Sequence, residues 1–209
     1  MRPISLREIC VVAALAASAS CLAGYGLAQN TDLKNVQSFA SIGDVKARSL
    51  ALFDEVGKVI THPRCMNCHP AGERPAQGDA RAPHQPPVAR GAAGIGVPGM
   101  QCNTCHGMSN APLSGVAIAS MPGNPAWALA PVEMAWQGKS LGAICEQLKD
   151  KNRNGGRDLA SIHEHMAHDE LVGWGWKPGD GRTPAPGSQA VFGELVQEWI
   201  KTGAECPAK

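Results

Sequence analysis

Two copies of one five-residue pattern constrain this chain more than any other feature. Residues 65–69 (CMNCH) and residues 102–106 (CNTCH) both read C-x-x-C-H, the pattern that attaches c-type haem. Two thiols at this spacing can each add to one vinyl group of the same porphyrin, and the histidine that follows is then held beneath the iron as its proximal axial ligand. The sequence therefore predicts two covalently bound haem c groups. The predicted attachment and proximal residues are Cys65, Cys68 and His69 in the first motif and Cys102, Cys105 and His106 in the second.

Two other uses of a C-x-x-C pair compete with this interpretation. Such a pair can be half of a zinc site or a thioredoxin-like dithiol. A four-cysteine zinc site does not require a histidine directly after both pairs. A redox dithiol is expected in a βαβ context, and the chain lacks the strand pattern for one. Both alternatives explain less of the repeated pattern than haem does.

The N-terminus has the layout of a secretory signal peptide. Arg2 and Arg7 precede an apolar run over residues 9–19, and small residues follow up to Ala28, as in a charged region, an apolar region and a small-x-small cleavage site. We expect residues 1–28 to be the signal peptide, with cleavage after Ala28. Because c-type haem is assembled on the outer side of the energy-transducing membrane, this export signal agrees with the haem motifs and predicts a periplasmic protein.

Two alternatives remain for this segment. Its apolar character continues to Leu27 with little interruption, so an uncleaved and membrane-anchored form is open. Lipidation at Cys21 is the other, although residues 18–20 lack the large aliphatic residue expected before a lipid-modified cysteine. No second apolar run is long enough to span a bilayer.

The eight cysteines divide into three sets. Cys10 and Cys21 lie in the predicted signal peptide, four cysteines lie in the haem motifs, and Cys145 and Cys206 remain. An even pair in an oxidising compartment favours a disulfide. The alternative is that Cys145 is simply buried, because it lies on an apolar stripe of helical spacing over residues 141–148.

Charge and composition exclude some partners and bear on how the core is filled. The chain has 19 basic and 18 acidic residues and no basic tract, so we expect no nucleic-acid partner. It contains 24 Gly and 16 Pro but only five Trp, one Tyr and three Phe. Because so loop-rich a chain has few large side chains for a core, we expect the two porphyrins to supply apolar bulk and the haem-free protein to fold poorly.

Helical patterns and capping residues predict a mainly α fold with little or no sheet. Gly/Pro-rich stretches over residues 71–100 and 110–138 are expected to be loops. The sequence predicts helices over residues 44–60, 140–149, 158–169 and 188–202.

These elements fit a small, loop-rich, cytochrome c-like domain, or two such lobes, built around two covalent haems. We assign residues 44–209 to this dihaem domain. Residues 29–43 are expected to form a flexible N-terminus.

Each iron needs a sixth ligand if it is to be closed, and helix phase favours His163. Leu159, Ile162, His163 and Met166 fall at i, i+3, i+4 and i+7, which places His163 toward the core. His165, two residues on, is expected to point nearly the opposite way. The alternative is that His163 is a core histidine satisfied by a hydrogen bond.

Two loop residues are further distal candidates. His84 lies alone between the motifs, and Met134 resembles the loop-borne methionine of small cytochromes c. Met121 and His62 are weaker candidates. A second histidine keeps the reduction potential low, whereas a methionine thioether raises it.

Five segments together resemble the bacterial dihaem cytochromes labelled isoquinoline 1-oxidoreductase subunits. The resemblance covers most of the chain from about residue 52 to residue 206, and it implies a protein that passes electrons from a molybdenum hydroxylase to the respiratory chain. The segments that carry it are residues 62–69 (HPRCMNCH), 84–91 (HQPPVARG), 101–107 (QCNTCHG), 134–140 (MAWQGKS) and 154–158 (NGGRD).

Two functional classes follow from the haem motifs. The first is an electron-transfer protein, not itself an enzyme, whose partners are a donor dehydrogenase and a downstream acceptor. The second is a haem enzyme or sensor with one open iron, similar to a dihaem peroxidase. Candidate histidines and methionines outnumber the two distal positions, which favours the first. After the haem thiols are used, no cysteine cluster remains for an iron–sulfur centre.

Overall fold

The computed structural model describes residues 32–115 and 118–209. It is rich in helix and has little sheet, which confirms the predicted mainly α class. The predicted signal peptide lies outside the described residues and stays a prediction. Within the described part, no helix combines the length and the apolar character needed to cross a bilayer.

The four predicted helices are all present, and each begins one residue after the start of its predicted range. Each cap side chain accepts a hydrogen bond from the backbone N–H three residues further on, which satisfies a donor that the first turn leaves free. The helices are α2 (Val45–Ile60, capped by Asp44), α4 (Leu141–Lys149, capped by Ser140), α5 (Leu159–His168, capped by Asp158) and α7 (Gln189–Lys201, capped by Ser188).

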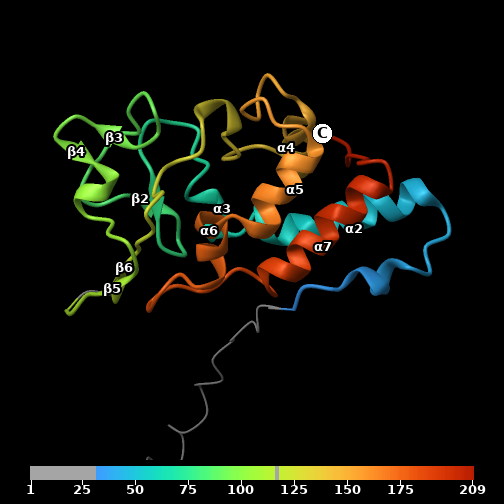
Figure 1. Ribbon diagram of the computed structural model, residues 1–209, viewed down its shortest axis with the longest axis horizontal. Helices are drawn as coiled ribbons and strands as arrows, with labels where there is room; N and C mark the ends of the chain where they lie inside the picture. The colour runs from blue at the N-terminus through green and yellow to red at the C-terminus, as the bar shows by residue number, and fades with distance from the viewer. Residues whose placement is uncertain (1–31, 116–117) are drawn as a thin grey trace, which may run out of the picture. The chain divides into compact units, whose positions relative to one another are not determined.

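Helix α7 packs against both α2 and α5, and these helices enclose the hydrophobic core (Figure 1). The rings of Phe53 on α2 and Trp199 on α7 lie 4.8 Å apart between centroids. Helix α5 approaches α7 closely because Gly193 has no side chain: a Cβ at that position would overlap Ala167. The largest buried apolar side chains are Leu52, Phe53, Val56, Val59, Ile60, Ile144, Leu148, Phe192, Leu195, Val196 and Trp199.

A disulfide joins Cys145 on α4 to Cys206 in the segment after α7. This confirms the predicted bridge, and Cys145 is also fully buried. The bridged segment is held further because the Trp199 indole N–H donates to the Glu205 carbonyl and the Glu205 N–H donates to the Ser49 hydroxyl. Closing a loop of this length stabilises a fold by about 4 kcal/mol in the chain-entropy model.

The remaining elements are short. Three antiparallel pairs of two-residue strands occur where the sequence predicted only loop, and they lie apart from the long helices (Figure 1). The pairs are β1 (Ala76–Gln77) with β2 (Ala82–Pro83), β3 (Gly96–Val97) with β4 (Met100–Gln101), and β5 (Ala111–Pro112) with β6 (Ser120–Met121). The short helical turns are η1 (Val36–Phe39), α3 (Pro63–Met66), η2 (Cys102–Thr104), η3 (Val132–Met134), α6 (Glu170–Gly173) and η4 (Trp174–Trp176).

The segment before α2 differs from the flexible N-terminus that the sequence suggested. Its turn η1 contacts α2 and α7, and Phe39 is buried. The Lys34 N–H also donates to the Glu55 carboxylate at 2.8 Å. Phe39 and the partly buried Leu33, Val36 and Ile42 tie this segment to the core.

No large apolar side chain is buried among the described residues between Met66 and Met134. This stretch contains the hairpins, the second C-x-x-C-H motif and the loops around it. It therefore has no side-chain core of its own, in contrast to the helical part.

Candidate functional site: the two C-x-x-C-H motifs

Both motifs have the same local backbone shape. Cys65 lies in α3 and Cys102 begins η2. In each motif the N–H of the second cysteine donates to the carbonyl oxygen of the first. The nitrogen–oxygen distance is 3.1 Å from Cys68 to Cys65 and 3.2 Å from Cys105 to Cys102. This single helical turn sets the spacing between the two thiols. All four motif cysteines are free, and the one disulfide of the described part lies elsewhere.

The two motif histidines are oriented in the same way, by backbone carbonyls from one later segment. His69 Nδ1 lies 2.7 Å from the Met134 carbonyl oxygen, and His106 Nδ1 lies 2.8 Å from the Pro122 carbonyl oxygen. A carbonyl can only accept, so Nδ1 carries the proton in each ring and Nε2 keeps its lone pair. This is how a metal-binding imidazole is usually fixed by its second nitrogen.

Burial favours the neutral forms of the motif histidines and of the first motif's cysteines. Desolvation lowers the pKa of His69 to about 4, and it lowers the pKa of His106 as well. Both imidazoles are therefore neutral at pH 7, as metal ligation requires. Burial also raises the pKa of Cys65 to about 12 and that of Cys68 to about 11, so these remain thiols.

An indole stacks on each motif histidine. The Trp136 ring lies 3.5 Å from the His69 ring between centroids, with 6° between the planes. The Trp127 ring lies 4.8 Å from the His106 ring at 22°. Each imidazole is therefore held both by a carbonyl at one edge and by an aromatic ring on one face.

Residues 122–137, which we call the proximal segment, supply all four of these contacts. The segment follows the first motif closely, because the Ala130 N–H donates to the Cys68 carbonyl and the Trp136 N–H donates to the His69 carbonyl. It reaches the loop before the second motif through the Leu129 N–H, which donates to the Gly94 carbonyl. One continuous stretch of chain thus serves both motifs.

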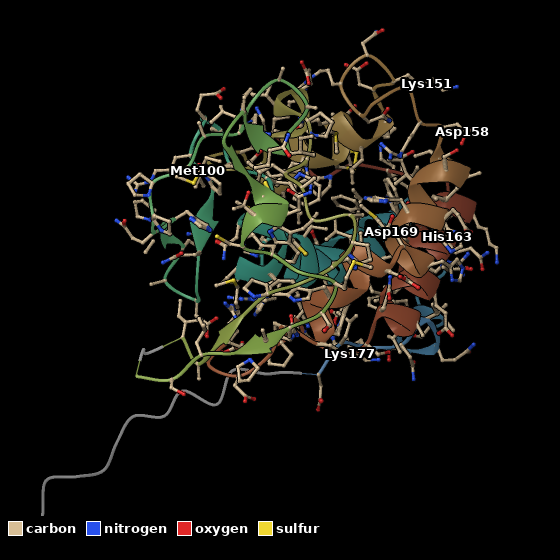
Figure 2. All side chains as sticks on the ribbon, turned by 60° about the vertical axis from the view of Figure 1, so that its left-hand side comes forward. Met100, Lys151, Asp158, His163, Asp169 and Lys177 are labelled. Carbon is tan, nitrogen blue, oxygen red and sulfur yellow. A yellow bond between two sulfur atoms is a disulfide. The ribbon has the colours of Figure 1, made fainter. Side chains whose placement is uncertain are left out.

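A cavity of about 480 Å³ is lined by residues of both motifs. Cys68 of the first motif lies in its wall together with Cys102, Cys105 and His106 of the second. Met100, near the second motif, also lines it and lies on the side of the described part opposite α5 (Figure 2). The volume falls in the range of small-molecule and cofactor pockets.

The charges around this cavity suit an apolar group that carries carboxylates. Arg64, Arg90 and Arg182 line it, and no Asp or Glu is among its described lining residues. Arg64 pairs with Asp79 at 2.5 Å, just outside the wall. Haem c is a large apolar macrocycle with two carboxylates, so the residues present fit this group in size, thiol placement and charge.

His84 lies in this cavity, opposite His106. The two ring centroids are 6.0 Å apart, with 65° between the planes. Two metal–imidazole bonds of about 2 Å, together with the two ring radii, require a separation of roughly 6 Å. His84 Nδ1 lies 2.9 Å from the Pro86 carbonyl oxygen, so its Nε2 is also left free. The predicted distal candidate therefore lies where an iron held by His106 could be closed.

Met134 lies on the wrong side of His69 to be its distal partner. Its carbonyl accepts from Nδ1, at the edge of the imidazole that faces away from Nε2 and therefore from the iron. Its side chain is buried in the hydrophobic core. A distal ligand must come from the opposite face of the porphyrin, so this arrangement does not favour Met134 as the distal ligand of the first motif.

Helix α5 has its predicted buried stripe but does not separate its histidines as expected. Ile162 and Met166 are buried as expected, but His163 and His165 are both half-buried, on opposite borders of this stripe. His163 lies on the border that carries Ala167, which faces α7, and its position is labelled in Figure 2.

His165 is the second half-buried histidine of α5. It is close enough for its charge to lower the pKa of His69, and burial lowers its own pKa. Its Nδ1 lies 3.3 Å from an Asp169 carboxylate oxygen. His165 is thus neither fully exposed nor part of the buried stripe, with 35% of its side chain exposed. Two apolar residues did not define the stripe sharply enough to rank the histidines on its borders.

The two weaker distal candidates have other contacts. His62 caps α3, and its Nδ1 accepts from the Arg64 N–H at 3.3 Å. Met121 belongs to β6 and lines the cavity.

The sequence reasoning did not identify the stacked indoles or the three arginines. The only sequence signal for the indoles was that two of the five tryptophans fall in one Gly/Pro-rich stretch.

Comparison with protein-family models, with curated proteins and with solved structures found no match to this chain. Among the described residues, no three His, Cys, Asp or Glu side chains gather as a metal-binding cluster. A c-type haem needs no such cluster, because its iron is carried by the porphyrin and takes only one histidine from each motif.

Proposed function

We propose that this chain is a periplasmic dihaem c-type cytochrome that transfers single electrons between partner proteins. Haem c, when bound, supplies reversible one-electron exchange at its iron. The chain's own residues attach the two porphyrins, orient the proximal imidazoles and set the electrostatic environment. No turnover of an organic substrate by the chain itself is part of this proposal.

The observation that carries the proposal is the matched environment of the two motif histidines. Each has Nδ1 bonded to a backbone carbonyl and one face covered by an indole, and each follows a helical turn that carries two free thiols. A redox dithiol has no use for such an imidazole, and a zinc site built from the four cysteines would leave both imidazoles unused. An axial haem ligand needs an imidazole prepared in this way.

The shared cavity supports a transfer role. Cysteines of both motifs line one space, so two porphyrins attached there would lie close together, as rapid electron exchange between them requires. The placement of His84 opposite His106 supports a closed second iron rather than a site for a small ligand.

Spectroelectrochemical titration with ligand binding tests the proposal. We expect two reversible one-electron steps per chain, no tight binding of carbon monoxide by the fully reduced protein, and no peroxide turnover at enzymatic rates. Tight binding of carbon monoxide to one ferrous haem, or rapid peroxide turnover, would instead favour a haem enzyme or sensor with an open iron.

The partner prediction is tested by reconstitution. A molybdenum hydroxylase with its organic substrate is the donor that the family resemblance implies. We expect the substrate alone to leave both haems oxidised and the addition of the hydroxylase to reduce them. Direct reduction by the substrate at a comparable rate would contradict a pure carrier role.

A further inference from the structure

The side chain of Asn110 bonds three groups beside the second motif. Its Oδ1 accepts from the Gly123 N–H at 3.1 Å and from the Trp174 indole N–H at 2.8 Å. Its Nδ2 donates to the carbonyl of Lys177 at 2.9 Å, and Lys177 is labelled in Figure 2. One amide thus joins the chain just after His106 to the proximal segment and to η4.

The bond to Gly123 acts on the peptide group that orients His106. The Gly123 N–H and the Pro122 carbonyl belong to the same peptide group, which is planar and trans, so their directions are linked. The Pro122 carbonyl oxygen lies 2.8 Å from His106 Nδ1. Holding the N–H therefore aims the carbonyl, and hydrogen bonds in series polarise one another. Asn110 thus makes the Pro122 carbonyl a better aimed and stronger acceptor.

The bond to Trp174 acts on the aromatic side of the same imidazole. Trp174 meets the Trp127 ring edge to face, with 4.9 Å between centroids and 83° between the planes. Trp127 in turn stacks on the His106 ring. An indole whose N–H is bonded has a fixed orientation, so Asn110 also holds the ring against which Trp127 packs. Both supports of His106, the carbonyl and the stacked indole, therefore depend on one side chain.

The first motif obtains the matching support from backbone. The carbonyl that holds His69 belongs to Met134. The N–H of that peptide group, on Ala135, donates to the Val132 carbonyl at 3.0 Å and closes η3. A backbone bond of this kind does not depend on a side chain. A change at Asn110 should therefore reach one haem and leave the other unchanged.

We propose that Asn110 is the positioning residue of the second haem site and that it sets both the orientation of His106 and the strength of its Nδ1 hydrogen bond. This assignment rests on the proposed function. A polarised carbonyl draws the Nδ1 proton more strongly, which makes Nε2 a better donor to the iron and favours the ferric state. Loss of the Asn110 side chain reverses this effect.

The test replaces Asn110 by alanine and, separately, by aspartate. Asn110→Ala removes the acceptor of the Gly123 and Trp174 donors. We expect the midpoint potential of one haem to rise while that of the other is unchanged. In the reduced protein, NMR should show several-fold faster solvent exchange of the His106 Nδ1 proton, because its hydrogen bond is weakened. Asn110→Asp keeps an acceptor oxygen, so the potential should not rise and the proton should stay protected.

Asn154→Ala is the matched control. The Asn154 amide also makes three hydrogen bonds, since Nδ2 donates to the Leu148 and Arg157 carbonyls and Oδ1 accepts from the Arg157 N–H. These bonds hold the turn between α4 and α5. Both alanine variants should lower the melting temperature, but only Asn110→Ala should change a midpoint potential and the exchange of a histidine proton.

Equal potentials in the unchanged protein and in Asn110→Ala, or the same rise in Asn110→Asp, would overturn the assignment. A measurement on the unchanged protein serves if the variants lose a haem. In its reduced form, the Gly123 amide proton and the Trp174 indole proton should both exchange slowly, and fast exchange of either would also overturn the assignment. An unchanged protein with the mass of the bare polypeptide would instead overturn the proposed function itself.

Discussion

At the residue scale, the imidazoles of the two motifs are oriented by the same kind of hydrogen bond, although the residues that accept it differ. His69 and His106 both present Nε2 because Nδ1 is held by a carbonyl, and both are kept neutral by burial. The carbonyls come from Met134 and Pro122, whose side chains play no part in these bonds. On the distal side, His84 faces His106 across the cavity.

Replacing His84 by alanine should open the second iron. We expect the fully reduced His84→Ala protein to bind one carbon monoxide per chain, with both haems still attached. His163→Ala is the control and should bind none, because His163 lies on the border of α5 that carries Ala167, which faces α7. An optical titration with carbon monoxide measures both. Absence of binding by His84→Ala, or equal binding by the two variants, would contradict the role given to His84.

At the element scale, the proximal segment joins the two motifs and its backbone has little freedom. Gly123 follows the carbonyl that holds His106, and a Cβ there would overlap the backbone carbonyl of Ser109. Gly107 lies just after the same motif and has open space at the corresponding position. The two glycines therefore separate an effect of the proximal segment from a general effect of substitution near the motif.

Gly123→Ala should disturb the second haem site through its proximal side. The added methyl group would push the Pro122 carbonyl away from His106, and overpacking of this kind costs about 1–3 kcal/mol. We expect a lower melting temperature and an altered paramagnetic resonance signal from one haem, with the other signal unchanged. Gly107→Ala should show neither change. Equal behaviour of the two variants would argue against a structural role for this turn.

Some of these elements could be predicted from the sequence and others could not. Helix boundaries were predictable because Asp44, Ser140, Asp158 and Ser188 cap locally. The disulfide followed from counting cysteines. The proximal segment was not predictable, because its key acceptors are backbone carbonyls, which every residue has. The buried stripe of α5 was predictable, but the ranking of its two bordering histidines was not, because it depends on how α5 packs against α7.

At the scale of the whole molecule, the chain divides by how its interior is filled. The helical part buries aromatic and aliphatic side chains against one another and is closed by a disulfide. The described residues between Met66 and Met134 bury no large apolar side chain but line the cavity that both motifs share. The sequence suggested that the haem-free protein folds poorly, and this division leads us to expect that effect in one part of the chain.

Haem-free protein should therefore be folded in the helical part and open between the two methionines. To obtain it, the protein is expressed without haem attachment, and the disulfide is then formed by oxidation. We expect amide hydrogen exchange to be slow in α2 and α7 and fast over residues 67–133, because the porphyrins fill the interior there. The haem-loaded protein should protect both regions. Equal protection of residues 67–133 with and without haem would contradict this prediction, because it would show that the side chains alone keep this part folded.

The central claim is that each motif carries one covalent haem, and the intact mass of the exported protein tests it most directly. We predict a mass equal to the processed polypeptide plus two haems, and a Cys102→Ala/Cys105→Ala protein that carries one haem fewer. The bonds are thioethers, so both values should survive denaturation. A mass equal to that of the bare polypeptide, with zinc bound in the native protein, would contradict the claim.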